Sequence, residues 1–311
     1  IPFFRADTAE VAYDWRDFLA GDVVFRSVRL VRPEVVLQKN PDGSWNFERV
    51  FGTRADRSGP PGRRPRIEFR DVRVADGSFA LRTPVDLPGG FWRTESGPDG
   101  HWQVLEFAGF DAHFPLLRIQ GRSPATPPLV RIGSFAGVAH VVPEATTVGA
   151  LRADLEIDGD TLAFDVFDLR FPGSRVFGHG TVAFAESGPS VDLVLRGERV
   201  ALADARWLVP WLPDRGTAVF DLRISSVRDG IAFAFENAEL SIGASRASGR
   251  LGFVLPDRGP VRLEGTDLGL DPLETRWIEA FTGEPFFFAG RIRGRFRGDG
   301  PPDRMRVDAD L

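Results

Sequence analysis

Hydrophobic and polar residues alternate one by one along much of this chain. In residues 151–158 every apolar residue falls at an odd position and every charged residue at an even one. The same alternation recurs in residues 191–196, 220–224, 261–264 and 291–297. A period of two places successive side chains on opposite faces of a β-strand, so each segment predicts a strand with one apolar and one wet face.

These strands recur with a period of about 70 residues between positions 151 and 296. At an offset of 69, residues 162–164 (Leu-Ala-Phe) align with residues 231–233 (Ile-Ala-Phe), and Gly180 aligns with Gly249. A fixed period indicates a unit that buries its apolar face by stacking on copies of itself. We expect five or six strands in each repeat.

The predicted fold class is all-β: an elongated, repetitive antiparallel sheet curled into a groove, with one or two short helices. Turn-forming residues at 40–43, 186–189, 228–230 and 256–260 separate the strands and predict antiparallel hairpins and meanders.

Helical signals are few. Asp271 is a candidate N-cap, Pro272 suits a first helical position, Glu274 follows three residues after the cap, and Gly283 would end the element. The equivalent segment one repeat earlier, 204–212, contains a proline and predicts only one or two turns.

Two Gly- and Pro-rich segments, 52–66 and 83–100, are predicted to be loops. The first carries five Arg and could be a solvated connector or a contact for anionic lipid head groups. The predicted organisation is an N-terminal β region (1–82), a connecting β region (83–150) and tandem repeats (151–311).

Composition narrows the function classes. The chain of 311 residues has a net charge of -5 and an isoelectric point near 5.5, which argues against a nucleic-acid surface. The absence of Cys excludes disulfides, thiolate metal sites and a Cys nucleophile. No apolar run is long enough for a membrane-spanning helix. Because the chain begins at Ile1 and ends within a predicted strand, we expect it to be a piece of a longer protein.

The sequence contains no recognisable catalytic or metal-binding pattern. The four His are scattered, and Gly178-His179-Gly180 lacks the third Gly of a dinucleotide fingerprint. Asp154, Glu156 and Asp158 share a strand face that could bind Ca²⁺, but such acids are common on solvated faces. We therefore expect no enzyme, no cofactor and no catalytic or metal residues.

Phe dominates the aromatic residues, with 27 Phe against one Tyr. Because Phe has no polar group, these rings favour a dry surface over a stacking platform for sugars or bases. Residues 285–288 (Pro-Phe-Phe-Phe) are expected either in the core or along a groove for an apolar ligand.

A more specific pattern lies near the N-terminus. Residues 15–37 contain a predicted strand pair that ends in a Pro-x-Val-x-Leu strand opened by Pro33. An Asp42-Gly43 turn and the sequence Trp45-Asn46-Phe47 follow. Physically this segment is a hairpin in which Pro33 opens an edge strand and Trp45 and Phe47 share a face.

The order of these elements resembles the AsmA-like superfamily, which includes AsmA, YhdP and TamB, and the resemblance is best over residues 9–50. It implies a bacterial envelope protein that extends into the periplasm as a folded β groove. An upstream helix outside this chain would anchor it in the inner membrane. Such proteins are associated with moving phospholipid to the outer membrane, and TamB-like members with assembly of outer-membrane β-barrel proteins.

The sequence leaves three functions open. The first is a periplasmic bridge that shields phospholipid acyl chains, or another acyl-chain ligand, against an apolar face. The second is an envelope assembly scaffold of TamB type that binds partners by strand addition. The third is a β-sandwich or solenoid binding module for glycans, which the single Tyr disfavours. The predicted groove lining is Leu151, Leu155, Ile157, Val191, Leu193, Leu195, Phe220, Leu222, Ile224, Leu263, Ile292 and Phe296.

Overall fold

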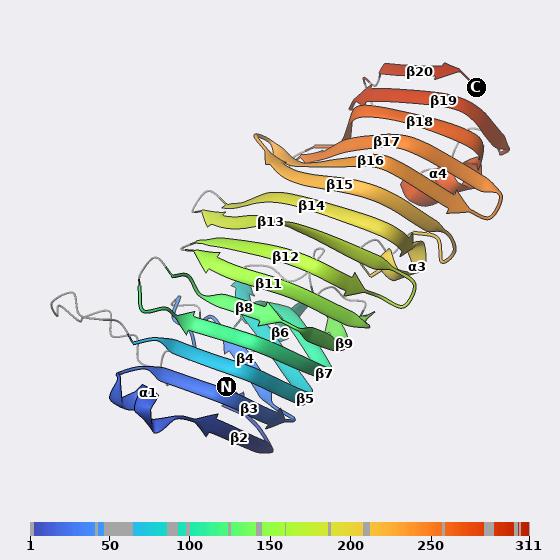
Figure 1. Cartoon of the computed structure of the whole chain (residues 1–311). Coiled ribbons are helices and arrows are strands. Elements are labelled where there is room, and N and C mark those ends of the chain that lie inside the picture. The colour runs from blue at the N-terminus through green and yellow to red at the C-terminus, as the bar shows by residue number, and fades with distance from the viewer. Residues whose placement is uncertain are drawn as a thin grey trace. The chain divides into compact units, whose positions relative to one another are not determined.

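The computed structural model describes residues 3–40, 43–46, 65–85, 93–97, 100–123, 126–140, 145–158, 160–185, 188–207, 212–256, 259–282, 289–301, 304 and 306–310. The chain separates into two compact units, Ile1–Ile157 and Asp158–Leu311, here called the N-terminal and C-terminal units. Strands dominate both units and the described helices are short, so the predicted all-β class is confirmed (Figure 1).

The elements of the N-terminal unit are β1 (Phe4–Arg5), β2 (Thr8–Tyr13), α1 (Trp15–Leu19), β3 (Val23–Val31), β4 (Glu34–Gln38), β5 (Ile67–Val85), β6 (Thr94–Gly97), β7 (Gly100–Gln120), β8 (Leu129–Ile132), β9 (Ser134–His140), β10 (Thr146–Val148) and β11 (Ala150–Asp158). Two long strands, β5 and β7, pair antiparallel and form the middle of the sheet. β3 and β4 both pair with β5, one after the other, along the edge of β5 that faces away from β7. β8 and β9 both pair with β7, along the edge of β7 that faces away from β5. β2 pairs with β3, and β11 pairs with β8.

The pairing of β5 with β3 and β4 is parallel, so the expectation of hairpins and meanders throughout is wrong for this unit. A parallel neighbour requires a connection of about a dozen or more residues. Residues 39–66 supply that length between β4 and β5.

Pro33 does not open an edge strand, because β4 lies between β1 and β5. It sits instead at the junction of β3 and β4, after Arg32, whose φ of 47° places the chain in the left-handed region. At such an irregular junction the missing N–H of Pro costs no regular ladder bond. Its carbonyl still accepts a hydrogen bond of 2.8 Å from the Ser78 amide.

The predicted turn after β4 is present. Gly43 has a φ of 84°, and Lys39 forms a bridge with Trp45 across the turn. The Asn46 side chain accepts from the Gln38 amide at 2.9 Å and donates to the Val36 carbonyl at 2.7 Å. The side-chain amide of Asn46 therefore takes the place of a backbone amide and holds the turn against β4. Asp42 and Phe47 lie outside the described residues.

The elements of the C-terminal unit are β12 (Thr161–Arg170), β13 (Arg175–Ala185), β14 (Gly188–Ala201), α3 (Leu202–Ala205), β15 (Thr217–Val227), β16 (Gly230–Ile242), β17 (Ser245–Pro256), β18 (Arg262–Glu274), α4 (Thr275–Thr282), β19 (Arg291–Gly300) and β20 (Arg306–Asp310). From β12 to β20 each strand pairs antiparallel with the next, so this unit is the predicted meander (Figure 1).

The sequence repeat corresponds to a repeat of elements. β12 to β15 with α3 are followed by β16 to β19 with α4, and a bulge at Val166/Leu169 recurs 69 residues later at Phe235/Ala238. Each repeat thus holds four strands, and the expected five or six was too many. The reason is strand length, since these strands are longer than the usual five or six residues.

The second helix begins later than predicted. Residues 271–274 belong to β18, and α4 starts at Thr275. A register shift between Leu270 and Leu273 accommodates Pro272 in the strand, because a bulge tolerates a residue without an N–H. Gly283 lies outside the described residues. The earlier helix, α3, is a single turn that starts at Leu202, before the predicted position 204.

The predicted loop at 83–100 also contains strands. β5 continues to Val85, and β6 forms a hairpin with β7 in which Gly97 pairs with Gly100. The predicted divisions at 82/83 and 150/151 fall inside β5 and β11. Residues 52–64 and 285–288 lie outside the described residues.

Candidate functional site: an apolar sheet face

Apolar side chains line up in rows across the strands of the C-terminal unit. Cross-strand neighbours define one row, running from Phe164 through Gly180, Leu193, Ile224, Phe233 and Phe253 to Leu263. A second runs from Val166 through Gly178, Leu195, Leu222 and Phe235 to Leu251. Because cross-strand partners point to the same side of a sheet, these rows form one continuous apolar face.

The N-terminal unit carries an equivalent row on its own sheet. It runs from Tyr13 through Phe25, Phe69, Leu117 and Val130 to Leu155. The rings of Phe25 and Phe69 stack with centroids 5.1 Å apart.

The predicted lining residues fall in both units. Leu151, Leu155 and Ile157 belong to the N-terminal unit and the other nine to the C-terminal unit. Within the C-terminal unit the structure brings together Leu193 with Ile224, and Leu195 with Leu222, as direct cross-strand pairs.

Most of these side chains are half-buried. Leu222 and Ile292 are buried, whereas Ile157 is 43% exposed. The remaining nine are intermediate. Lateral packing along a row therefore removes part of each side chain from water and leaves the rest accessible to an apolar ligand.

Two glycines allow the rows to pack closely. A Cβ at Gly180 would lie 2.4 Å from the Asp192 carbonyl oxygen, and one at Gly178 would lie 2.1 Å from that of Val194. Each glycine lies beside a leucine of the next strand, Leu193 or Leu195. Only glycine fits at these two positions, so each leucine side chain packs directly against the backbone of the glycine beside it.

Helix α4 covers one end of this face. Leu270, Leu273 and Ile292 form a buried cluster, against which Trp277 and Ile278 of α4 pack. Phe296 also contacts this cluster. Ile292 and Phe296 thus belong to a closed core and are weaker candidates for lining than Leu193 or Ile224.

Sequence reasoning missed the aromatic members of the face, chiefly Phe164, Phe233, Phe235 and Phe253. In residues 231–235 (Ile-Ala-Phe-Ala-Phe) both strand faces are apolar, so polarity cannot tell them apart. Residue size could have found them, since the large side chains occupy every second position.

The opposite face of the C-terminal unit carries cross-strand ion pairs. Arg223 lies 3.2 Å from Asp192, Arg250 lies 2.9 Å from Glu236, and Arg295 lies 2.6 Å from Asp267. Hydrogen bonds from Arg295 hold the pKa of Asp267 below its usual value.

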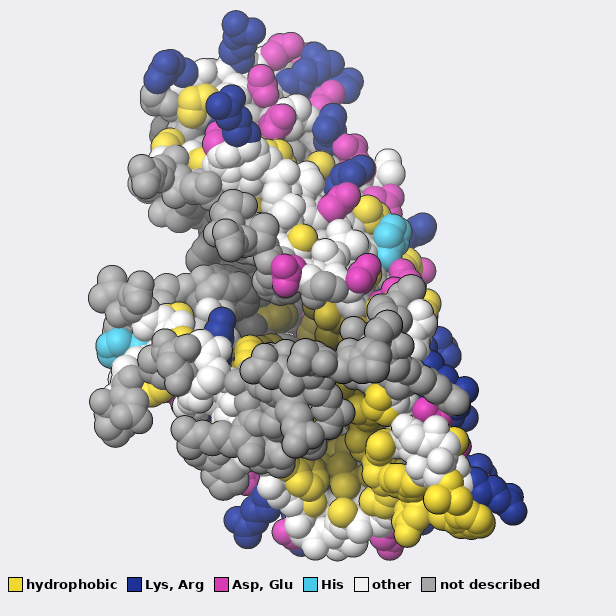
Figure 2. Space-filling model, turned by 90° about the vertical axis from the view of Figure 1, so that its left-hand side faces the viewer, with side chains coloured by type: hydrophobic (Ala, Val, Ile, Leu, Met, Phe, Trp, Pro, Cys, Tyr) yellow, Lys and Arg dark blue, Asp and Glu magenta, His cyan; other side chains and the backbone are white. Residues whose placement is uncertain are grey.

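Figure 2 shows Lys, Arg, Asp and Glu along one edge of the view and hydrophobic side chains gathered at its lower end, over the first strands of the N-terminal unit.

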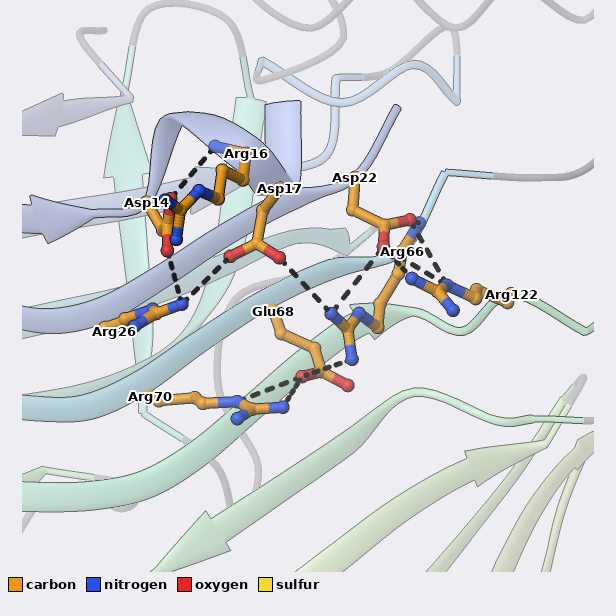
Figure 3. A network of polar contacts seen from close by, with 9 residues as sticks. All are labelled: Asp14, Arg16, Asp17, Asp22, Arg26, Arg66, Glu68, Arg70 and Arg122. Carbon is orange, nitrogen blue, oxygen red and sulfur yellow. Dashed lines mark hydrogen bonds and ion pairs between the residues drawn. The ribbon is translucent and has the colours of Figure 1, made fainter. Parts of the chain in front are cut away.

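A buried ionic network lies at the start of the N-terminal sheet (Figure 3). The side chain of Asp22 is 1% exposed and accepts hydrogen bonds from the Arg66 amide at 3.1 Å and from the Arg122 guanidinium. The hydrogen bond from Arg122 lowers the pKa of Asp22 to about 2, although burial opposes the shift. Glu68, also buried, accepts from Arg70 at 2.9 Å.

The same network fixes helix α1 (Figure 3). Asp14 caps the helix by accepting from the Arg16 amide at 3.0 Å, and it accepts from Arg26 at 2.8 Å. Asp17 lies 3.9 Å from Arg26 and 4.0 Å from Arg66. A five-residue helix is too short to be stable alone, so these contacts hold it in place.

The acids considered for Ca²⁺ do not form a site. Asp154 is paired with Arg131 at 3.0 Å. Within the described ranges, no three His, Asp or Glu side chains are grouped as metal ligands would be. Likewise, none of the described helices has the length and hydrophobicity needed to cross a bilayer.

Comparison with known proteins adds no family to these observations. No protein-family model matches the chain, and no curated protein and no solved structure is significantly similar to it.

Proposed function

We propose that the chain shields phospholipid acyl chains along the apolar faces of its sheets, as part of a periplasmic bridge for lipid transport and outer-membrane biogenesis. The observation that carries this proposal is the alignment of half-buried apolar side chains in register across β12 to β18, with ion pairs on the opposite face. The cellular setting rests on the AsmA-like resemblance: a bacterial periplasm, with an inner-membrane anchor upstream.

The energetics favour such a face. An acyl chain of about 16 carbons left in water costs on the order of 12 kcal/mol, at about 0.8 kcal/mol per methylene. Shielding therefore has to be continuous along the path. At about 4.8 Å per strand, the six spacings from β12 to β18 would offer a track of roughly 30 Å.

Two adjacent residues of β14 allow a direct test. Leu193 points to the apolar face, whereas Val194 pairs with Arg223 on the charged face and is 39% exposed. A photo-crosslinking amino acid at position 193 should capture phospholipid in bacterial envelopes, and the same group at position 194 should not. Equal labelling at both positions, or none at 193, would contradict the proposal.

A second candidate is the TamB-type scaffold, for which β2 is the relevant feature. Among the described strands β2 pairs only with β3, and all six of its residues are exposed. An unpaired edge of this kind can accept a strand from a partner.

Substitution separates the two candidates. With the photo-crosslinking amino acid at position 224, which pairs with position 193, replacing Leu155 and Leu193 by Asp should abolish lipid labelling and spare partner binding under the bridge proposal. Loss of captured outer-membrane protein with unchanged lipid labelling would favour the scaffold.

A further inference from the structure

Large apolar side chains are exposed together around α1 in the N-terminal unit. Tyr13 is 60% exposed, Trp15 61%, Phe18 42% and Leu19 78%. These four residues, here called the α1 patch, occupy the end of β2 and the five-residue helix that follows. Exposed apolar groups gathered at one place mark an interaction surface.

The α1 patch is held rigidly. Asp14 and Asp17, the acids of this segment, are only 21% and 24% exposed, and both are engaged by Arg26. Arg66 ties Asp17 to the buried Asp22 (Figure 3). The polar side of α1 is thus fixed to the sheet, and its apolar side is presented outward.

One basic group adjoins the α1 patch. The Arg16 guanidinium lies 5.7 Å from the centre of the Trp15 ring and takes part in none of the ion pairs of the described residues, whereas Arg26 is paired with Asp14 and Asp17. The charge of Arg16 beside the α1 patch therefore complements an anionic surface.

The composition of the α1 patch favours a lipid bilayer over a protein partner. Trp and Tyr concentrate at the level of lipid head groups, and a protruding Leu beside Phe can enter the acyl region. A stable protein interface uses about 20 to 30 residues on each side, far more than these four.

The α1 patch is continuous with the apolar face of the same unit. Ring centroids lie 5.4 Å apart for Tyr13 and Phe18, 6.2 Å for Phe18 and Phe25, and 5.1 Å for Phe25 and Phe69. The row then continues to Leu117 through the register of β5 with β7. Aromatic rings thus connect the exposed helix to the sheet face without a polar interruption.

We propose that the α1 patch docks the chain onto the surface of an anionic lipid bilayer. Leu19 and Phe18 enter the upper acyl region, while Trp15 and Arg16 lie at the head groups. Movement of acyl chains from the bilayer onto the Phe25–Phe69 row would follow only if the proposed function holds. The docking of the α1 patch onto a bilayer does not depend on the proposed function.

Vesicle flotation tests the docking. The chain should float with vesicles of phosphatidylcholine and phosphatidylglycerol, and less with phosphatidylcholine alone. The double variant Trp15→Ser/Leu19→Ser should lower the partition coefficient by about tenfold or more. Arg16→Gln should reduce the preference for anionic vesicles about fivefold. Ile119→Ser, at a 57% exposed position of β7, is the matched control and should bind as the parent chain does.

Three outcomes would overturn docking: no binding by the parent chain, equal binding by the double variant, or a self-association that the double variant abolishes in sedimentation experiments. Circular dichroism checks that the variants fold. Crosslinking from position 193 to detergent-dispersed phospholipid reports on the acyl-chain face without any bilayer. Failure of docking and failure of the proposed function are therefore distinguishable.

Discussion

Replacing Asp22 by Asn is the sharpest test of what holds the N-terminal unit together. The Asp22 carboxylate is 1% exposed, accepts hydrogen bonds from the Arg66 backbone amide and the Arg122 guanidinium, and lies 3.6 Å from the Arg66 guanidinium. Asn keeps the volume but removes the charge, so both guanidinium groups lose their buried partner. Arg122 remains 48% exposed and can be rehydrated, which reduces the cost below that of a fully buried pair.

The magnitude follows from the pKa. A shift from 3.8 to about 2 corresponds to about 2–3 kcal/mol, at about 1.4 kcal/mol per unit. Because the folded pKa lies below the unfolded value, this stability is complete above about pH 5 and is lost as the pH falls through 2. The difference between the parent chain and Asp22→Asn should therefore shrink as the pH falls from about 5 to about 2.

Hydrogen exchange suits this test, because it reports the opening of individual strands. Near neutral pH, amides of β3 and β5 should lose about 60-fold protection in Asp22→Asn. The control is Asp229→Asn in the C-terminal unit. That carboxylate is paired with Arg262 but is 55% exposed, so solvent screens the pair and we expect a much smaller loss of protection than in Asp22→Asn. An equal loss in both variants, or a pH-independent difference, would refute the reasoning.

Two further substitutions probe the apolar face of the C-terminal unit. Gly180→Val should destabilise this unit by about 1–3 kcal/mol in urea unfolding, because its Cβ would lie 2.4 Å from the Asp192 carbonyl oxygen. The control is His179→Val at the neighbouring, exposed position, which should be nearly neutral. Equal effects of the two substitutions would contradict the close approach of the strands at Gly180. Ile292→Ala should cost about 2–4 kcal/mol in its closed cluster, whereas Leu255→Ala, at a position 42% exposed, should cost less than about 1 kcal/mol.

Period-two patterning was enough to predict the strands and the apolar side of most of them. It identified Leu193, Leu195 and Ile224 because charged residues occupy the positions between or beside them. It failed where both faces are apolar, as at Phe233 and Phe235, because the pattern then does not show which face of the strand each side chain occupies. Spatial pairing supplied the missing information.

The sequence pattern also could not predict which strands pair when they are far apart in the sequence. The parallel placement of β3 beside β5 depends on the path of residues 39–66, which no local signal specifies. The α1 helix was missed for a related reason. Its five residues form a helix because Asp14 and Asp17 meet Arg26 and Arg66, and Arg66 is distant in sequence.

The partial burial of the apolar face bears on its purpose. A face that serves only as a core gains most when a second layer covers it completely, as α4 covers Leu273 and Ile292. Leu193, Leu195 and Ile224 instead keep an intermediate exposure within well-paired strands. Their remaining accessible surface is a cost to the folded chain alone and a gain once an acyl chain lies on it. Adding phospholipid should therefore increase hydrogen-exchange protection across β14 to β16 and leave the α4 cluster unchanged.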